Sequence, residues 1–120
     1  MSEIVMYILC NSNVKMSGGK LAAQVAHSAC KIVYGVLERG CLTEKSREDF
    51  DVWWRGSYAK IILKSNEEQM KELKKKYPDI CEWTVDEGRT EIPKGTLTTL
   101  AFVPMAKDEA PSELKSLKLM

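Results

Sequence analysis

Short apolar runs of strand length alternate along this chain with longer amphipathic stretches of helical length. The apolar runs predict strands at 4–10, 59–63, 81–85 and 97–103, and the amphipathic stretches predict helices at 18–38, 45–55, 67–77 and 107–113. No linker or internal repeat interrupts the series, so we expect one domain over residues 1–120. Its order predicts an α/β fold with a mostly parallel or mixed central sheet covered by helices on both faces.

The helix predicted at 18–38 carries one polar stripe. At about 100° per residue, four polar side chains fall within an arc of about 60°; they are Lys20, Gln24, His27 and Lys31. The rest of its surface is mostly apolar and includes Ala22, Ala29 and Val36. This composition predicts a deeply buried helix whose polar stripe marks a site.

The start of this helix is also readable. Ser17 is a good N-cap, and Gly18 and Gly19 allow a partner to approach the backbone closely. Free amide groups there would attract an anion. A nucleotide-binding phosphate loop is excluded, because Val14 stands where that motif needs glycine and Leu21 where it needs serine or threonine.

A second polar cluster covers 86–96, between two predicted strands. Gly88 and Gly95 supply permissive backbone conformations and Pro93 a fixed one, which is typical of an ordered turn. Asp86 directly follows the strand predicted at 81–85. Sites on open α/β sheets usually lie at strand ends, so Asp86 is a strong candidate for a functional carboxylate.

Three separated motifs in this chain resemble those of the peptidyl-tRNA hydrolase 2 family of archaea and eukaryotes. They are Lys15-Met-x-x-Gly19-Lys20-Leu-Ala-Ala-Gln24-Val-Ala-His27, Asp86-x-Gly88-Arg89-Thr90-Glu-Ile-Pro-x-Gly95-Thr96-x-Thr98, and the closing Leu117-Lys118-Leu119. Together they span nearly the whole chain and stand in the family's order. The resemblance implies a three-layer α/β/α sandwich with a four-stranded mixed central sheet, and a homodimer.

The activity that the resemblance implies is hydrolysis of the ester that joins a peptide to the terminal ribose of tRNA. Such an ester needs a positioned water, a proton acceptor and one or two donors for the developing oxyanion. The family motifs and side-chain chemistry together make the catalytic candidates Lys20, His27, Asp86, Thr90 and Thr98. No cofactor is implied.

Several roles stay open for these residues. Lys20, held by Asp86, could stabilise the oxyanion or bind the ribose-phosphate end, and either Asp86 or a neutral His27 could deprotonate water. Thr90 and Thr98 would fix the water or the ester carbonyl. The alternative is that Lys20 and Asp86 only tie helix to loop, and that His27 acts indirectly.

The formal net charge of +1 gives no reason by itself to expect a nucleic-acid partner. The distribution of charge matters more, because basic residues gather in the two clusters and would form a local patch for tRNA phosphates if the fold joins them. The RNA-binding candidates are Lys15, Gln24, Lys31, Arg89 and Lys94. We expect peptidyl-tRNA as the partner, and neither DNA nor a membrane.

The chain departs from the family pattern at several positions. Asn11 and Asn13 replace a usual Arg and Asp, and Glu87 replaces a usual alanine beside Asp86. A non-catalytic interaction module that keeps the fold is therefore the main alternative to the hydrolase. A general small-molecule-binding domain is the second, but the chain contains no Gly-x-Gly-x2-Gly fingerprint.

Cysteine usage and the termini complete the predictions. The four cysteines show no metal-ligand spacing and the chain has one histidine, so we expect reduced thiols, with Cys10, Cys30 and Cys81 as small buried hydrophobes, and no metal site. No basic leader and no apolar run of about 20 residues is visible, which favours a cytoplasmic protein. Trp53 and Trp54 predict a contact with the core or with a second subunit.

Overall fold

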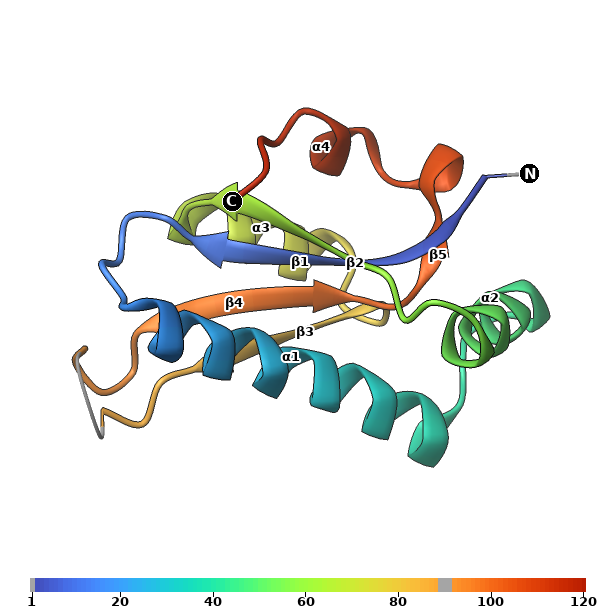
Figure 1. Ribbon diagram of the computed structural model, residues 1–120, viewed down its shortest axis with the longest axis horizontal. Coiled ribbons are helices and arrows are strands. Elements are labelled where there is room, and N and C mark those ends of the chain that lie inside the picture. The colour runs from blue at the N-terminus through green and yellow to red at the C-terminus, as the bar shows by residue number, and fades with distance from the viewer. Residues whose placement is uncertain (1, 89–91) are drawn as a thin grey trace.

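The computed structural model describes residues 2–88 and 92–120. The elements follow the chain as β1 (Ile4–Asn11), α1 (Gly18–Arg39), α2 (Glu44–Arg55), β2 (Lys60–Ser65), α3 (Glu67–Lys76), β3 (Cys81–Val85), β4 (Leu97–Phe102), β5 (Met105–Ala106), a 3₁₀ turn (Lys107–Glu109) and α4 (Ser112–Lys115). Figure 1 shows these elements around one sheet. The predicted order of the long helices and strands is confirmed.

The sheet is mixed and holds five strands. Its order is β2-β1-β4-β3, and β5 also pairs with β1. β1 and β2 are parallel, whereas β4 is antiparallel to both β1 and β3. The expected count of four was wrong, because β5 has only Met105 and Ala106, which are too few to show a hydrophobic period.

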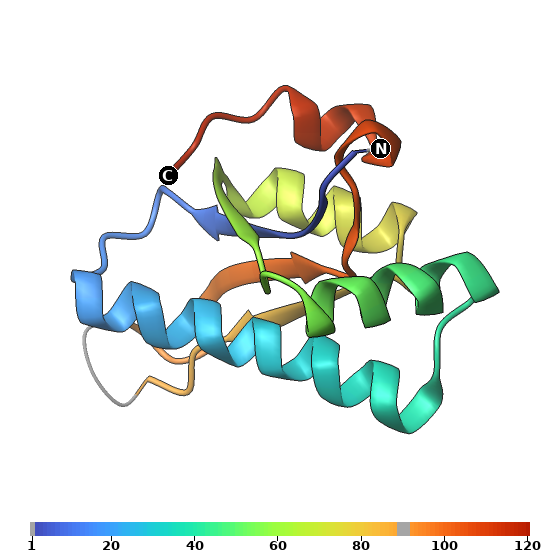
Figure 2. The ribbon, with the colours of Figure 1, turned by 45° about the vertical axis from the view of Figure 1, so that its right-hand side comes forward.

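Helices cover both faces of the sheet, so the predicted three-layer arrangement is confirmed (Figure 2). Successive side chains of β1 point to opposite faces. Val5, Tyr7 and Leu9 pack in the core cluster that contains residues of α3 and α4. Met6 and Ile8 pack in the cluster that contains residues of α1 and α2.

Helix α1 begins as predicted, with the Ser17 side chain accepting a hydrogen bond from the Lys20 N–H at 3.3 Å. The expectation that α1 is deeply buried is wrong. Ala22 is exposed, and Tyr34 and Leu37 are 66% and 65% exposed. The reason is that one face of α1 packs on β3 and β4, while the opposite face meets solvent.

The helix predicted at 107–113 is also wrong. A 3₁₀ turn at Lys107–Glu109 and the short α4 replace it. Pro111 causes the break, because a proline disfavours helical backbone in the residue before it, and Ala110 is extended with φ −64° and ψ 143°.

The cysteine predictions hold in part. All four thiols are free, and Cys10 and Cys81 are buried as expected, but Cys30 is exposed. Burial raises the pKa of the Cys10 and Cys81 thiols to about 11, so both stay protonated near neutral pH. Cys30 lies on the solvent side of α1, where the predicted deep burial does not occur.

The two tryptophans of α2 separate into different environments. Trp53 is 3% exposed and packs in the core with Phe50, whereas Trp54 is 49% exposed. The indole N–H of Trp53 donates to the Ala59 carbonyl at 2.8 Å.

Among the helices of residues 2–88 and 92–120, none is long and apolar enough to cross a membrane.

Candidate functional site

The predicted contact between Lys20 and Asp86 is present. Lys20 lies in the first turn of α1, Asp86 lies directly after β3, and the ammonium group pairs with Oδ1 of the carboxylate. The two side chains are 10% and 4% exposed. Asp86 Oδ2 accepts the Gly88 N–H at 2.7 Å. Both carboxylate oxygens are therefore held in place.

The hydrogen bond from Lys20 is the main reason that the pKa of Asp86 lies below its ordinary value of 3.8. Burial acts in the opposite direction, while the Gly88 N–H and the Coulombic interaction with Lys20 lower it further. Asp86 is thus a carboxylate at neutral pH.

Backbone hydrogen bonds close the loop around Asp86. Its N–H donates to the Thr96 carbonyl, and its carbonyl accepts the Gly95 N–H, both at 2.8 Å. Gly88 and Gly95 have φ of 77° and 88°, as the glycine pattern predicted. A Cβ on Gly88 would also lie 2.8 Å from Cα of Lys94. This position therefore needs glycine, whose N–H the turn directs at the carboxylate.

Gln24 lies one turn after Lys20 and joins the same carboxylate. Its Nε2 is 3.4 Å from Asp86 Oδ1, and its Oε1 accepts the Thr98 hydroxyl at 2.5 Å. Gln24 is 3% exposed and Thr98 is fully buried on β4. The Thr98 hydroxyl orients the amide, so that the NH₂ group faces Asp86.

A line of buried hydroxyls continues the polar contact between α1 and the sheet. Ser28 Oγ lies 2.7 Å from the hydroxyls of both Thr84 and Thr99, and Thr99 donates to the Gln24 carbonyl at 3.0 Å. Each hydroxyl has one hydrogen, so Thr99 must accept from Ser28, and Ser28 from Thr84. The sequence reasoning missed these three residues. Only Ser28 carried a signal, because it follows Gln24 by four residues on the same stripe.

Lys20, Gln24 and His27 line a groove of about 800 Å³ between α1 and the end of β3. Lys31 lies further along it and donates to the Trp83 carbonyl at 2.8 Å. His27 is exposed, and Glu87 also lines the groove. The structure therefore brings together two carboxylates, two ammonium groups, an amide and an imidazole around a space open to solvent.

The other candidates lie elsewhere. Lys94 is exposed and, with Asn13, lines a separate cavity of about 400 Å³. Lys15 is exposed in the segment between β1 and α1. Asn11 is buried, and its side-chain amide donates to the Leu97 carbonyl at 3.0 Å, which ties β1 to the start of β4. The candidates Arg89 and Thr90 lie outside the described residues.

Possible metal ligands do not cluster in the part of the chain that the structure describes. It contains no group of three or more His, Cys, Asp or Glu side chains that could hold a metal ion.

The fold and the groove define a three-layer α/β protein with a charged site at one end of its sheet. A family model described as "Peptidyl-tRNA hydrolase PTH2" matches residues 4–120. This chain belongs to that family.

Two similar proteins come from archaea, and each is named "Peptidyl-tRNA hydrolase". The protein of Staphylothermus marinus is 33% identical over 123 residues, which cover 97% of each chain. The protein of Saccharolobus solfataricus is 33% identical over 121 residues, which cover 98% of this chain and 99% of the relative. The similarity thus extends over nearly the whole length of both relatives.

Proposed function

We propose that this chain is an enzyme that hydrolyses the ester between a peptide and tRNA, and so releases free peptide and reusable tRNA. The observation that carries the proposal is the Lys20–Asp86 pair at an open groove, in a chain of the peptidyl-tRNA hydrolase PTH2 family. A carboxylate and an ammonium group with low exposure are costly to bury unless they bind each other. Such a pair beside a groove favours a role in chemistry.

In this proposal Lys20 and Gln24 stabilise the oxyanion. Gln24, a candidate RNA contact from the sequence, is given this role instead because it is only 3% exposed. Both carry N–H groups, and both line the groove on consecutive turns of α1. Donors that are already in place when negative charge develops are typically the largest electrostatic contribution to ester hydrolysis. Asp86 holds the two donors in position, and Thr98 fixes the orientation of the Gln24 amide.

His27 is the proposed proton acceptor. Asp86 has a lowered pKa and already accepts hydrogen bonds at both oxygens, which makes it a weak base for water. Imidazole is the side chain that most often transfers protons near neutral pH. His27 is exposed and lines the same groove, so water can reach it. Thr90 is kept as a candidate from the family motif alone.

The tRNA is proposed to bind through its phosphates. Lys31 lies in the groove, and Lys15 and Lys94 are exposed on the segments before α1 and β4. Contacts of this kind do not depend on base sequence, as an enzyme for many tRNAs requires. Arg89 joins this set from the sequence motif. Exchange of Lys94 for glutamate should raise KM more than it lowers kcat.

We also propose that the chain acts in the cytoplasm as a homodimer. The exposed rings of Trp54 and Tyr58 lie edge to face with centroids 5.5 Å apart, and they form an apolar surface next to the core. Burial of such rings is common at subunit interfaces. Sedimentation equilibrium measures the molar mass in solution and so tests the dimer. The mass of a monomer at all protein concentrations would contradict it.

The direct test of the activity is release of tRNA from N-acetylated aminoacyl-tRNA. We expect turnover by the wild type and at least about a hundredfold loss in Lys20→Ala, the scale expected when one oxyanion donor is removed. Lys71→Ala is the matched control, because Lys71 pairs with Glu67 at 3.7 Å on the exposed face of α3. A folded wild type that binds tRNA without turnover would support the non-catalytic alternative.

A further inference from the structure

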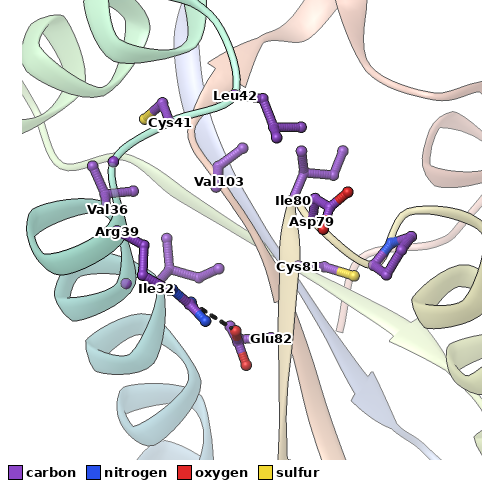
Figure 3. A pocket seen from close by; sticks show the side chains of 13 residues that line it. Ile32, Val36, Arg39, Cys41, Leu42, Asp79, Ile80, Cys81, Glu82 and Val103 are labelled. Carbon is purple, nitrogen blue, oxygen red and sulfur yellow. Dashed lines mark hydrogen bonds and ion pairs between the residues drawn. The ribbon is translucent and has the colours of Figure 1, made fainter.

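Two further cavities follow the groove at the candidate site along α1, toward the C-terminal end of the helix. A second cavity of about 390 Å³ shares Lys31 with the groove, and a third of about 230 Å³ shares Gly35, Arg39 and Glu82 with the second. Figure 3 shows the third cavity, with Arg39 reaching from α1 toward Glu82 on β3. We call the three together the α1–β3 groove.

One wall of the α1–β3 groove is the free edge of the sheet. β3 is the last strand in the order and pairs along its length only with β4 among the named strands. The Ile80 carbonyl accepts the Val103 N–H, so the carbonyls of Cys81 and Trp83 face away from β4.

Lysine side chains occupy both of these outward carbonyls. Lys74 donates to Cys81 O at 2.7 Å, and Lys31 donates to Trp83 O at 2.8 Å. A lysine side chain is flexible, so its ammonium group can give up a carbonyl to an incoming main-chain N–H. A carbonyl that is already paired with a neighbouring strand could not be freed in this way. The edge of β3 is therefore able to accept another extended chain.

We propose that the peptide part of the substrate lies extended in the α1–β3 groove and pairs with the main chain of β3. This inference rests on the proposed function. Because the first of the three cavities is lined by Lys20 and Asp86, a peptide esterified there can extend past Lys31 along the α1–β3 groove. Main-chain pairing accepts nearly any side chain, which suits an enzyme that must act on many peptides.

The chemistry of the ester sets the direction of this pairing. The carboxyl end of the peptide lies at Asp86, and β3 runs from Cys81 toward Asp86. The peptide is therefore parallel to β3. Lys20 and Arg39 are 19 helical positions apart, or about 28 Å. This length holds about eight extended residues.

Substrates of different peptide length test the inference. We expect the kcat/KM of the wild type to rise by about tenfold between one and eight residues, which corresponds to a modest gain in binding, and to stay level beyond that. Equal kcat/KM at every peptide length would overturn peptide binding in the α1–β3 groove but would leave the proposed hydrolysis unaffected. No hydrolysis of any substrate would overturn the proposed function as well.

A groove-filling variant locates the effect. Gly35 lines the second and third cavities, and a Cβ there would lie 2.6 Å from the flexible end of Arg39. Leucine is a better helix former than glycine, so Gly35→Leu should fold. We expect its kcat/KM to vary by less than about twofold between one and eight residues, whereas Leu37→Gln, on the exposed face, keeps the tenfold rise. An unchanged rise in Gly35→Leu would overturn the proposal.

Methylation of single peptide amides separates main-chain pairing from general contact. In a strand only every second N–H points at a given neighbour. We therefore expect an N-methyl group to cancel the gain in kcat/KM at alternate positions among the peptide residues that lie beside the five residues of β3. Equal losses at all positions would overturn pairing with β3.

Discussion

The two halves of α1 cover the same face of one sheet with opposite chemistry. The first half buries Gln24 and Ser28, which are 3% and 0% exposed. The second half buries Ile32 and Val36, each 3% exposed, in a cluster with residues of β1 and α2. One helix thus supplies a polar interface near its start and an apolar interface near its end.

The polar half is tolerated because its groups bind one another. In residues 2–88 and 92–120, no buried side-chain nitrogen or oxygen lacks a hydrogen-bond partner. Unsatisfied polar groups would cost about 1–3 kcal/mol each, whereas satisfied networks fix unique positions. The comparison teaches that the apolar half of α1 contributes mainly to stability and the polar half mainly to geometry at the groove.

The largest expected effect is a loss of activity in the variant Gln24→Met, which changes the polar half of α1. Methionine has a similar shape but removes the amide between Asp86 and Thr98. We expect kcat to fall by about a hundredfold or more, as when an oxyanion donor is lost. Single-turnover release of tRNA measures this, and a rate within threefold of the wild type, which is about 0.65 kcal/mol, would remove Gln24 from the mechanism.

The apolar half should show the opposite response. Ile32→Ala leaves a cavity between α1 and the sheet, and we expect the free energy of unfolding to fall by about 2–4 kcal/mol. Ile32 also lines the third cavity, so activity is compared on N-acetylated aminoacyl-tRNA, whose single residue does not extend that far; the kcat of the folded variant on this substrate should remain near that of the wild type. Denaturant unfolding measures the first quantity. Tyr34→Ala, 66% exposed, is the control and should change stability by less than about 0.5 kcal/mol.

The line of hydroxyls predicts that substitutions at Ser28 and Thr84 have non-additive effects on the free energy of unfolding. Ser28→Ala leaves the buried Thr84 hydroxyl without its acceptor, which should cost about 1–3 kcal/mol in the free energy of unfolding. A further Thr84→Val exchange removes the orphaned donor, so the double variant should be more stable than Ser28→Ala alone. Simple addition of two losses in a double-mutant cycle would contradict the hydrogen bond between Ser28 and Thr84.

The smallest effect concerns pH. Because the pKa of Asp86 is lowered in the folded chain, chiefly by Lys20, its contribution to stability is present above its ordinary value of 3.8. That contribution is lost as the pH falls through the lowered value. The difference in unfolding free energy between wild type and Asp86→Asn should therefore shrink in acid. A constant difference from pH 7 to pH 2 would contradict the ion pair.

Local patterns in the sequence were enough for the long elements and for part of the site. The N-cap at Ser17, the positive φ of Gly88 and the contact of Lys20 with Asp86 agree with the structure. These features depend on short spacings or on the family motifs. The sequence suggests that Thr98 fixes the water or the ester carbonyl, whereas in the structure its buried hydroxyl donates to the Gln24 side chain.

Features that depend on tertiary contacts were not predictable in this way. The exposure of Ala22 and Cys30 follows from which face of α1 meets the sheet, and apolar composition alone does not show that. Thr84 and Thr99 are ordinary strand residues until the fold sets them opposite Ser28. The short β5 exists only because β1 lies beside it.

The most direct test of the central claim is one turnover of N-acetylated aminoacyl-tRNA by Asp86→Asn, with tRNA affinity measured on the same folded sample. The account predicts that ester cleavage slows by about a hundredfold or more, because Lys20 and Gln24 lose the group that positions them. The dissociation constant for tRNA should change by less than about threefold, or about 0.65 kcal/mol. Cleavage at the wild-type rate would contradict a catalytic site at Asp86.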